Sequence, residues 1–503
     1  MRTERIPVLE ASTEKLHGIF PVAYGNEEES GIMDDITGSF DEPYTLVANL
    51  RDYVPSEVQS TNTSIVMFLR NGSKIYPGGI GNRSRATNLE RATQECAQPS
   101  DLGLAIRAEE LLLAKTAENY VKAESLNHEK RVTLRSQRRV VDSRGSRKAC
   151  HDNFALERDA PFVSDFWGKA EAPPDLLAYA ASKGIIDGAG YVREYGLHFS
   201  QKVGGLSSLY NYGYMGSMFR FSSSEGNPRI EVRHNDINIS DWAIQVRVGG
   251  MALAIALSQT PLSSQLPRLA AEQAVRKTNA MNRLTLRDDG TIESNASLIR
   301  AINMQQATAE LAMSRLCLYV DEVPEELLWA ATERYRFCDD MRRVIAGDES
   351  IGLLSDRADW AGKLSLTLAG LQRDRAAGMT RSLTDMKSQF SDMRYDYKEF
   401  SAINGKLQKT KVGAGYKLRD KGQYRGRKYT DRQVNEAYRH PIPGTRAAIR
   451  GQLLERYHVT VCDWTGVLIR DDEQGYEFDL DEVTQTELSD LDKHRLNNIK
   501  RIR

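Results

Sequence analysis

The chain contains 503 residues with a mass of 56.5 kDa, enough for about three domains or for one large domain with an appendage. Hydrophobic residues make up 40% and charged residues 27% of the chain, proportions that are typical of a globular protein and that exclude wholesale disorder. Because 68 basic residues nearly balance 69 acidic ones, the net charge of −1 excludes a protein that binds polyanions through its overall charge.

Membrane-spanning and secretory segments are not expected. The longest apolar stretch, Val248 to Leu257, is much shorter than the roughly 20 residues of a membrane-spanning helix. The first residues are charged and lack the apolar region of a signal peptide. The cysteines are scattered and form no CxxC motif, which argues for a reducing compartment and against a disulfide framework or a zinc site. We therefore expect a cytoplasmic protein.

The first part of the chain is predicted to contain short strands and one long helix. Residues 19–24 are compatible with a strand, and the acidic, turn-rich stretch 26–43 is predicted to be a loop. Residues 65–69 and 74–76 flank an Asn-Gly sequence, an arrangement that is typical of a β-hairpin. The spacing of leucines over 100–125 predicts an amphipathic helix.

The middle of the chain is predicted to be mainly helical, with a few short strands. A helix over 173–186 is expected to stop at the glycines that follow it. The small and apolar residues of 242–257 predict a buried helix. The apolar periodicity of 298–319 and of 364–386 predicts two more helices.

Residues 406–439 differ in composition from the rest of the chain, because Gly, Lys, Arg and Tyr dominate and aliphatic residues are few. Basic residues interleaved with aromatic ones would suit single-stranded nucleic acid, but a solvated linker is favoured and nucleic acid is not the expected partner. Residues 440–503 are predicted to form a small domain with a helix at 445–457 and a strand at 459–469. The predicted organisation is a main domain of residues 1–405, the linker, and this C-terminal domain.

Short motifs spread along the chain carry a resemblance to a known family. In chain order they are FLRNGSKIY (Phe68–Tyr76), LERATQEC (Leu89–Cys96), CHDNF (Cys150–Phe154), GIIDGAGYV (Gly184–Val192), FSQK (Phe199–Lys202), RIEVRHNDINIS (Arg229–Ser240), DWAGKL (Asp359–Leu364), GTRAAIRG (Gly444–Gly451) and CDW (Cys462–Trp464). Each motif is short, but their collinear order resembles that of the Pup ligase and depupylase family. The last two motifs are more similar to the depupylase branch.

The resemblance implies an α+β fold, with a glutamine-synthetase-like curved antiparallel sheet that forms a cradle, helices behind it and a small C-terminal domain. It implies ATP and Mg²⁺ as cofactors. The implied partners are a Pup-like ubiquitin-like modifier and lysine-bearing target proteins, whose tagging is linked to the proteasome.

Activation of the modifier's carboxylate by phosphoryl transfer depends mostly on positioning and charge neutralisation. Such a site needs Mg²⁺ held by carboxylates and cations at the phosphates. A base must then remove a proton from the attacking lysine. Carboxylates at alternate positions of a strand suit the metal, because they lie on one face.

The resemblance assigns the metal ligands to Glu90, Glu95 and His151. Asp152 and Asn153 follow His151 where the family has Glu and Asn, so Asp152 is the candidate catalytic residue and Asn153 a further site residue. Each of these residues also fits a role without catalytic or binding function. Glu90 and Glu95 also fit solvated carboxylates of a loop, and His151 also fits a structural histidine.

The resemblance assigns cofactor binding to Arg229, Asn238, Arg446 and Arg450, and it places Asp236 at the rim of the cradle. Asp236 and Asn238 equally fit a turn, because Asn-Asp-x-Asn is a common turn composition. Arg446 and Arg450 are four residues apart and so share one face of the predicted helix, where exposure to solvent is the usual outcome.

The chain departs from the family pattern at several acidic positions. The family's first strand carries two carboxylates, but Pro21 and Ala23 stand at those places here, and an alternative register recovers only Glu10. Tyr76 is followed by Pro-Gly where the family has its general-base Asp. The general base is therefore not identified.

Three functions stay open. The first is an ATP-dependent ligase that joins the C-terminal Glu of a Pup-like modifier to lysines of target proteins, or a depupylase or deamidase that hydrolyses such a bond. The second is a catalytically impaired pseudoenzyme that binds nucleotide or modifier, as the missing acids suggest. The third is an unrelated protein with a basic tether for nucleic acid.

Overall fold

The computed structural model describes most of the chain. The described residues are 15–34, 50–59, 66–77, 88–137, 150–162, 172–193, 196–203, 218–222, 227–287, 291–379, 385, 390, 395–471, 474–497 and 499.

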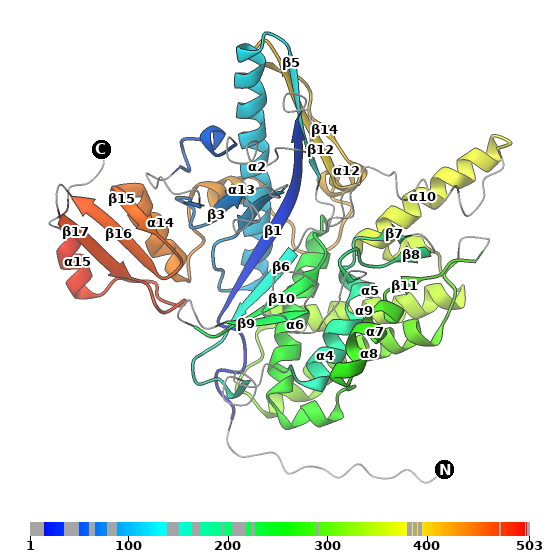
Figure 1. Cartoon of the computed structure of the whole chain (residues 1–503). Coiled ribbons are helices and arrows are strands. Elements are labelled where there is room, and N and C mark those ends of the chain that lie inside the picture. The colour runs from blue at the N-terminus through cyan, green and yellow to red at the C-terminus, as the bar shows by residue number, and fades with distance from the viewer. Residues whose placement is uncertain are drawn as a thin grey trace.

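A large antiparallel sheet runs through the centre of the molecule (Figure 1). Its main path has the order β13-β12-β5-β1-β4-β3-β2, and β6, β10 and β9 continue from the other end of β1. β14 pairs with β12. The strands of this sheet are β1 (Ala23–Asp34), β2 (Met67–Phe68), β3 (Lys74–Pro77), β4 (Asn88–Ala92), β5 (Arg131–Gln137), β6 (Cys150–Ala155), β9 (Phe219–Ser222), β10 (Arg229–Asn235), β12 (Tyr397–Ile403), β13 (Lys406–Leu407) and β14 (Lys411–Val412).

Helices cover one face of this sheet, which we call the helix face. The long α2 (Pro99–Asn127) packs against β1, β5 and β12, and α6 (Asp241–Ser258) packs on α2. Further helices contact α6: α4 (Pro174–Ser182), α5 (Gly184–Asp187), α8 (Ala296–Arg315) and α9 (Glu325–Ala346). α7 (Ala271–Met281) packs on α4 and α8, and α10 (Asp359–Ala376) contacts α12 (Ala414–Asp420). Beside them lies a small sheet of β7 (Tyr191–Arg193), β8 (Gly196–His198) and β11 (Arg283–Leu284).

The predicted helices are confirmed, with shifted ends. Every residue of α6 is buried, as its small and apolar composition predicted. α8 ends at Arg315, where a 3-10 turn, Leu316–Leu318, continues the chain. α10 starts at Asp359, before the predicted boundary. The predicted hairpin is also confirmed, since β2 and β3 pair around Gly72, whose positive φ of 82° suits glycine.

β1 is the central strand, and it carries polar residues on both of its faces. Asn26 and Glu28 are buried on the helix face, whereas Glu27 and Glu29 alternate with them on the opposite, open face. Burial of a charge is costly unless it is paired, and Arg91 of β4 pairs with Glu28 at 3.1 Å. Because neither face is apolar, the sequence pattern did not indicate a strand. The predicted loop is therefore wrong for the part of it that forms β1.

The C-terminal part of the chain has its own small sheet, beside the hairpin of β2 and β3 (Figure 1, orange and red). Its elements are α14 (Arg446–Arg456), β15 (Val459–Cys462), β16 (Gly466–Asp471), β17 (Gln474–Asp479) and α15 (Asp490–Asn497). The predicted single strand is thus a hairpin. A separate apolar cluster fills this part, and Phe68 of β2 joins it.

Residues 406–439 do not form a solvated linker, which corrects the sequence prediction. They contain β13, β14, α12 (Ala414–Asp420) and α13 (Asp431–Arg439), and α13 packs on α2. Tyr416 and Tyr424, taken as nucleic-acid candidates from the sequence, are buried. These tyrosines therefore pack in the interior. The sequence did not indicate this, because the segment contains few aliphatic residues.

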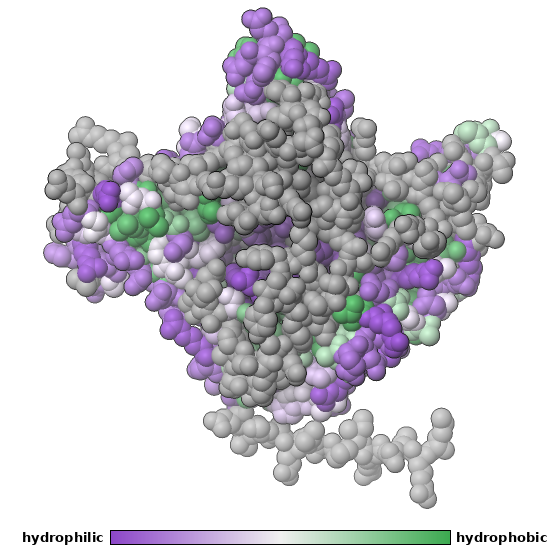
Figure 2. Space-filling model, viewed as in Figure 1, coloured by the Kyte–Doolittle hydropathy of each residue, from purple (hydrophilic) through white to green (hydrophobic). Residues whose placement is uncertain are grey.

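The described atoms on the face shown in Figure 2 are mostly hydrophilic, and apolar side chains gather over the C-terminal sheet on the left. Among the helices that the structure describes, none combines the length and the apolar character that crossing a membrane requires. The large antiparallel sheet and its helix layer confirm the predicted α+β fold.

Candidate functional site

The open face of the sheet gathers acidic and basic side chains from neighbouring strands. Glu27 of β1 lies opposite His151 of β6, and Glu231 of β10 lies opposite Asn153. On the other side of β1, Glu29 lies opposite Glu90 of β4. Directly opposite residues of an antiparallel pair project to the same side. All of these side chains therefore share the open face.

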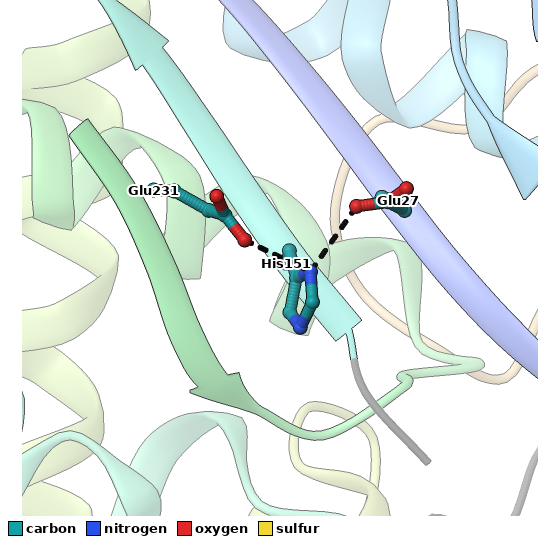
Figure 3. Close-up of side chains that lie close together, drawn as sticks. All are labelled: Glu27, His151 and Glu231. Carbon is teal, nitrogen blue, oxygen red and sulfur yellow. Dashed lines mark hydrogen bonds and ion pairs between the residues drawn. The ribbon is translucent and has the colours of Figure 1, made fainter. Parts of the chain in front are cut away.

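Three of these side chains converge (Figure 3). His151 Nδ1 lies 3.1 Å from Glu27 Oε2 and 3.1 Å from Glu231 Oε1. His151 and Glu231 are buried, while the side chain of Glu27 is 24% exposed. Within the described ranges, this is the only group of three or more His, Cys, Asp or Glu side chains with ligand atoms close enough for one metal ion.

The electrostatics of the cluster favour the carboxylate form of Glu27. Burial would raise the pKa of Glu27, but the hydrogen bond and charge of His151, with the charges of Lys74 and Arg229, lower it to about 2. Glu27 is therefore ionised at neutral pH. Two carboxylates and an imidazole form a donor set that fits a divalent cation such as Mg²⁺ or Mn²⁺.

The sequence-predicted metal ligands separate into two places. His151 is in the cluster, and Glu90 shares the open face, opposite Tyr76 of β3. Glu95 lies elsewhere, 2.9 Å from Arg446 Nε and 2.5 Å from Arg450 Nη2. Its role as a metal ligand stays a prediction that this geometry does not favour, because both of its oxygens already pair with arginines.

Glu95 is firmly ionised by these arginines. Burial raises its pKa, but the charges and hydrogen bonds of Arg450 and Arg446 outweigh burial and lower the pKa to about 2. Arg450 also donates to the Gly72 carbonyl at 2.8 Å and stacks over the rings of Phe68 and Trp464. Glu95 and Arg450 thus join the C-terminal part to the hairpin of the main sheet.

A pocket lies beside the cluster, between the open face and the C-terminal part. Four of the predicted site residues line it: Glu95, Asn153, Arg229 and Arg446. The other lining residues are Ala23, Tyr24, Gly25, Asn26, Ala92, Thr93, Ala155, Asn227, Trp464 and Val483. An aromatic wall and two arginines suit a ligand with a planar ring and negative charge.

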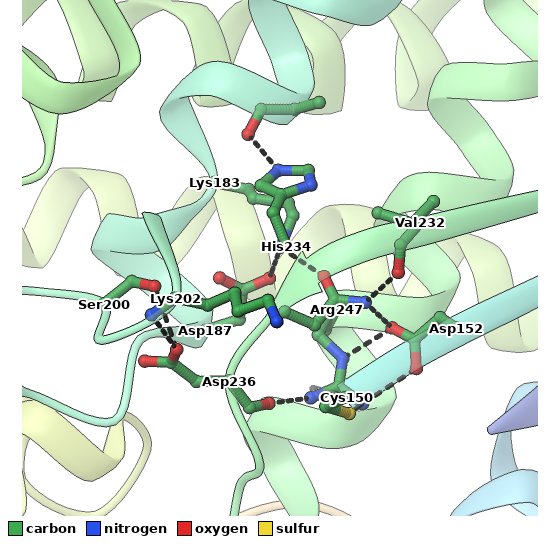
Figure 4. Close-up of polar contacts among 12 residues, drawn as sticks. Cys150, Asp152, Lys183, Asp187, Ser200, Lys202, Val232, His234, Asp236 and Arg247 are labelled. Carbon is green, nitrogen blue, oxygen red and sulfur yellow. Dashed lines mark hydrogen bonds and ion pairs between the residues drawn. The ribbon is translucent and has the colours of Figure 1, made fainter. Parts of the chain in front are cut away.

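Three predicted site residues lie on the helix face instead (Figure 4 shows Asp152 and Asp236). Asp152 pairs with Arg247 of α6 at 2.7 Å. Asp236 accepts hydrogen bonds from the backbone of Ala189 and of residues 201–202, so it organises two loops.

Asn238, the third of them, donates to Asp187 O at 2.9 Å and to Asp359 Oδ2 at 3.0 Å. Asp187 is itself paired with Lys183 behind the sheet at 2.9 Å. The predicted roles of Asp152, Asp236 and Asn238 in the cradle stay predictions, and burial behind the sheet argues against them.

Sequence reasoning missed Glu27 and Glu231. It placed the family's first-strand acids at Pro21 and Ala23, because the stretch that forms β1 was interpreted as a loop; Glu10, the alternative, lies outside the described residues. Alternation was the available signal, since Glu27 and Glu29 are two apart. Glu231 lay inside a quoted motif but was not selected.

A larger hollow lies away from the cluster, between α2, α6 and α9. Two of its carboxylates are already engaged: Glu326 accepts from the Ser100 N–H at 3.0 Å and pairs with Arg427 at 3.2 Å, and Glu333 accepts from the Trp242 indole at 3.0 Å. The lining residues are Pro99, Ser100, Gln245, Glu325, Glu326, Trp329, Glu333, Arg425, Gly426 and Arg427. No converging ligand set is found among these residues, so the cluster on the open face remains the candidate site.

Comparison with known proteins identifies the family. A family model described as Pup-ligase protein matches residues 27–211 and 220–468. The chain belongs to the Pup-ligase family. The first matched residue is Glu27, so the match includes the cluster. This membership excludes the unrelated nucleic-acid-binding protein that the sequence had left open.

Members of the family with different names are similar to this chain. The Pup–protein ligase of Acidimicrobium ferrooxidans is 23% identical over 478 residues, covering 90% of this chain and 93% of that protein. The depupylase of Acidothermus cellulolyticus is 23% identical over 437 residues, covering 82% and 77%.

Solved structures share the fold. The Pup ligase PafA in its complex with Pup superimposes with a TM-score of 0.72 at 19% identity, covering 94% of this chain and 92% of that one. PafA in complex with ADP gives a TM-score of 0.64 at 20% identity, covering 86% and 90%. The predicted glutamine-synthetase-like ligase fold, with its sheet backed by helices, is confirmed.

Proposed function

We propose that this chain is an ATP-dependent ligase that joins the side-chain carboxylate of the C-terminal Glu of a Pup-like modifier to lysines of target proteins. Its family and its similarity to a named Pup–protein ligase over most of both chains support this proposal. The observation that carries it is the convergence of Glu27, His151 and Glu231 beside a pocket lined by two arginines.

The residues of the open face suit the parts of such a reaction. Glu27, His151 and Glu231 would hold Mg²⁺, which supplies charge neutralisation to a bound triphosphate. Arg229, together with Arg446, whose charge is shared with Glu95, would neutralise the remaining phosphate charge in the adjoining pocket. The complex of PafA with ADP supports a nucleotide as a ligand of this chain.

The base for the attacking lysine has two candidates outside the cluster, Glu29 and Glu90. They lie opposite each other on β1 and β4, next to Tyr76, after which the family carries its Asp. Burial behind the sheet and pairing with cations argue against Asp152 and Asp187 in this role.

The test uses the purified chain with Mg·ATP, a modifier that ends in Glu and a lysine-bearing protein. We expect release of ADP and phosphate and a conjugate whose mass is the sum of both proteins less one water. Glu27→Gln should abolish the conjugate, while Glu310→Gln, an exposed acid on α8, should not. Nucleotide binding without any turnover would instead establish the pseudoenzyme.

Hydrolysis of the same bond is the second candidate. The similarity to a depupylase over 82% of this chain favours it, as do the depupylase-like motifs near the C-terminus. A preformed conjugate distinguishes the two functions: release of intact target protein on adding the chain and nucleotide, with no conjugate formed from the free proteins, would assign hydrolysis.

A further inference from the structure

One buried carboxylate behind the cluster collects hydrogen bonds from three elements. Asp152 Oδ1 accepts from Asn26 Nδ2 at 2.8 Å and from Arg247 Nη2 at 2.9 Å. Asp152 Oδ2 accepts from Asn235 Nδ2 at 2.9 Å and from Arg247 Nε at 2.7 Å. Asp152 is 1% exposed, so each oxygen is satisfied by two donors without water.

Asp152 and two of its donors come from the same strands as the cluster. Asp152 follows His151 on β6, and Asn26, directly opposite Asp152, precedes Glu27 on β1. Asn235 ends β10, the strand of Glu231, after a register shift that begins at Val232. The period of two places cluster and carboxylate on opposite faces of the same strands. The Asp152 carboxylate on the helix face therefore links all three strands that carry the cluster residues.

Arg247 anchors that point to the helix layer. Its Nη1 donates to Asp236 O at 2.9 Å and to Asn238 Oδ1 at 2.5 Å, so all three guanidinium nitrogens are engaged. Arg247 is 1% exposed and belongs to α6, whose residues are all buried. A bidentate Arg–carboxylate pair has a defined geometry, which a single point charge lacks.

We propose that Asp152, with Arg247 as its counter-ion, is a positioning residue that sets the separation of Glu27, His151 and Glu231. The proposal rests on the metal-holding role of these three side chains in the proposed function. Ligands that come from three strands keep their separation only while the strands keep their register. Residues behind the ligands typically change metal affinity about 10–100-fold when they are removed.

The competing view is that Asp152 and Arg247 stabilise the core and do nothing else. The matched control is Glu110→Gln, since Glu110 of α2 makes a similar buried pair with Arg419 of α12 at 2.7 Å. That pair joins α2 to α12 and contains no residue of the three cluster strands. If the role of Asp152 is purely structural, disrupting either the Asp152–Arg247 pair or the Glu110–Arg419 pair should lower stability and leave metal affinity unchanged.

The experiment measures Mn²⁺ binding to the full chain by electron paramagnetic resonance, with thermal unfolding in parallel. The variants are Asp152→Asn, and Asn26→Ala, which removes one tie without leaving a buried charge unpaired. We expect Mn²⁺ affinity to fall about 10-fold or more in both variants and to stay within about twofold in Glu110→Gln. Phosphate release by Asn26→Ala should recover as Mg²⁺ is raised.

The outcomes separate the two proposals. If wild type binds Mn²⁺ and Asn26→Ala binds it equally well, the positioning role of Asp152 is wrong while the proposed function stands. If wild type binds no Mn²⁺, the metal centre itself is wrong, and the positioning role fails with it. Should Asp152→Asn not fold, Asn26→Ala decides the question.

Discussion

The two faces of the central strands use polar residues in opposite ways. On the open face, Glu27, His151 and Glu231 converge as a donor set that suits a cation. On the helix face, one position away, Asp152 and Arg247 form a fully satisfied buried pair. The same strands therefore combine a site that suits a ligand with a network that needs none. Stability and metal binding should respond to different faces, and substitutions can test this separation.

The largest effect is expected on the helix face. Arg247→Ala leaves the Asp152 carboxylate buried without its counter-ion, which typically costs about 3–5 kcal/mol. Urea unfolding without metal measures the loss. Arg343→Ala is the control, because Arg343 pairs with Asp340 and Glu349 at a 47% exposed site and should cost no more than about 1 kcal/mol. Equal losses of unfolding free energy in Arg247→Ala and Arg343→Ala would contradict the special stabilising role of the helix face.

On the open face, the reverse pattern is expected. Glu27→Gln removes a cluster carboxylate and should weaken Mn²⁺ binding by at least about 100-fold, the upper range for residues behind a ligand. The unfolding free energy should fall by less than in Arg247→Ala, since the Glu27 side chain is partly exposed and Glu231 still pairs with His151. Calorimetric titration with Mn²⁺ checks the first expectation, and a large loss of stability would contradict the second.

Glu95 provides a pH test at the edge of the open face. Its pKa is about 2 in the folded chain and 4.5 in the unfolded chain, so the unfolded chain takes up the proton first. The stabilisation is complete above pH 4.5 and is lost as the pH falls toward 2, by roughly 2–3 kcal/mol. Between pH 5 and pH 3, the melting temperature should therefore fall less steeply in Glu95→Gln than in the wild type. If the melting temperatures of both proteins fall equally with pH, the ion-pair assignment is wrong.

The smallest effect concerns the segment first taken for a linker. The Tyr424 hydroxyl donates to Asp359 Oδ1 at 3.2 Å and contacts the Tyr395 hydroxyl. Tyr424→Phe should lower the unfolding free energy by about 1 kcal/mol and leave Mn²⁺ affinity unchanged. Tyr476→Phe, whose hydroxyl bonds only to the exposed Gln474 among the described contacts, should cost almost nothing. Altered metal binding in Tyr424→Phe would link this segment to the cluster.

Much of the fold was predictable where the pattern is local. The apolar composition of α6 predicted burial, and the Asn71-Gly72 turn predicted the hairpin of β2 and β3. β1 was not predictable in this way, because its buried residues include Asn26 and Glu28. Only partners on other elements make such residues stable inside the protein.

For the candidate site, too, local motifs predicted some residues, and contacts with other elements decided the rest. His151, Asn153, Arg229 and Arg446 were selected from short motifs, and the structure places them at the cluster or its pocket. Asp152 was selected from the same motif as His151, yet it faces the helices. Adjacent residues of a strand point to opposite faces, so one motif contributed to both.

By itself, the sequence determined the helices, the hairpin and the family, because period, turn chemistry and collinear motifs are all read along the chain. The tertiary structure alone decided which acids meet and which are buried. Arg247 reaches Asp152 across 95 residues and His151 reaches Glu27 across 124. Such contacts depend on strand register and helix packing, which no local pattern contains.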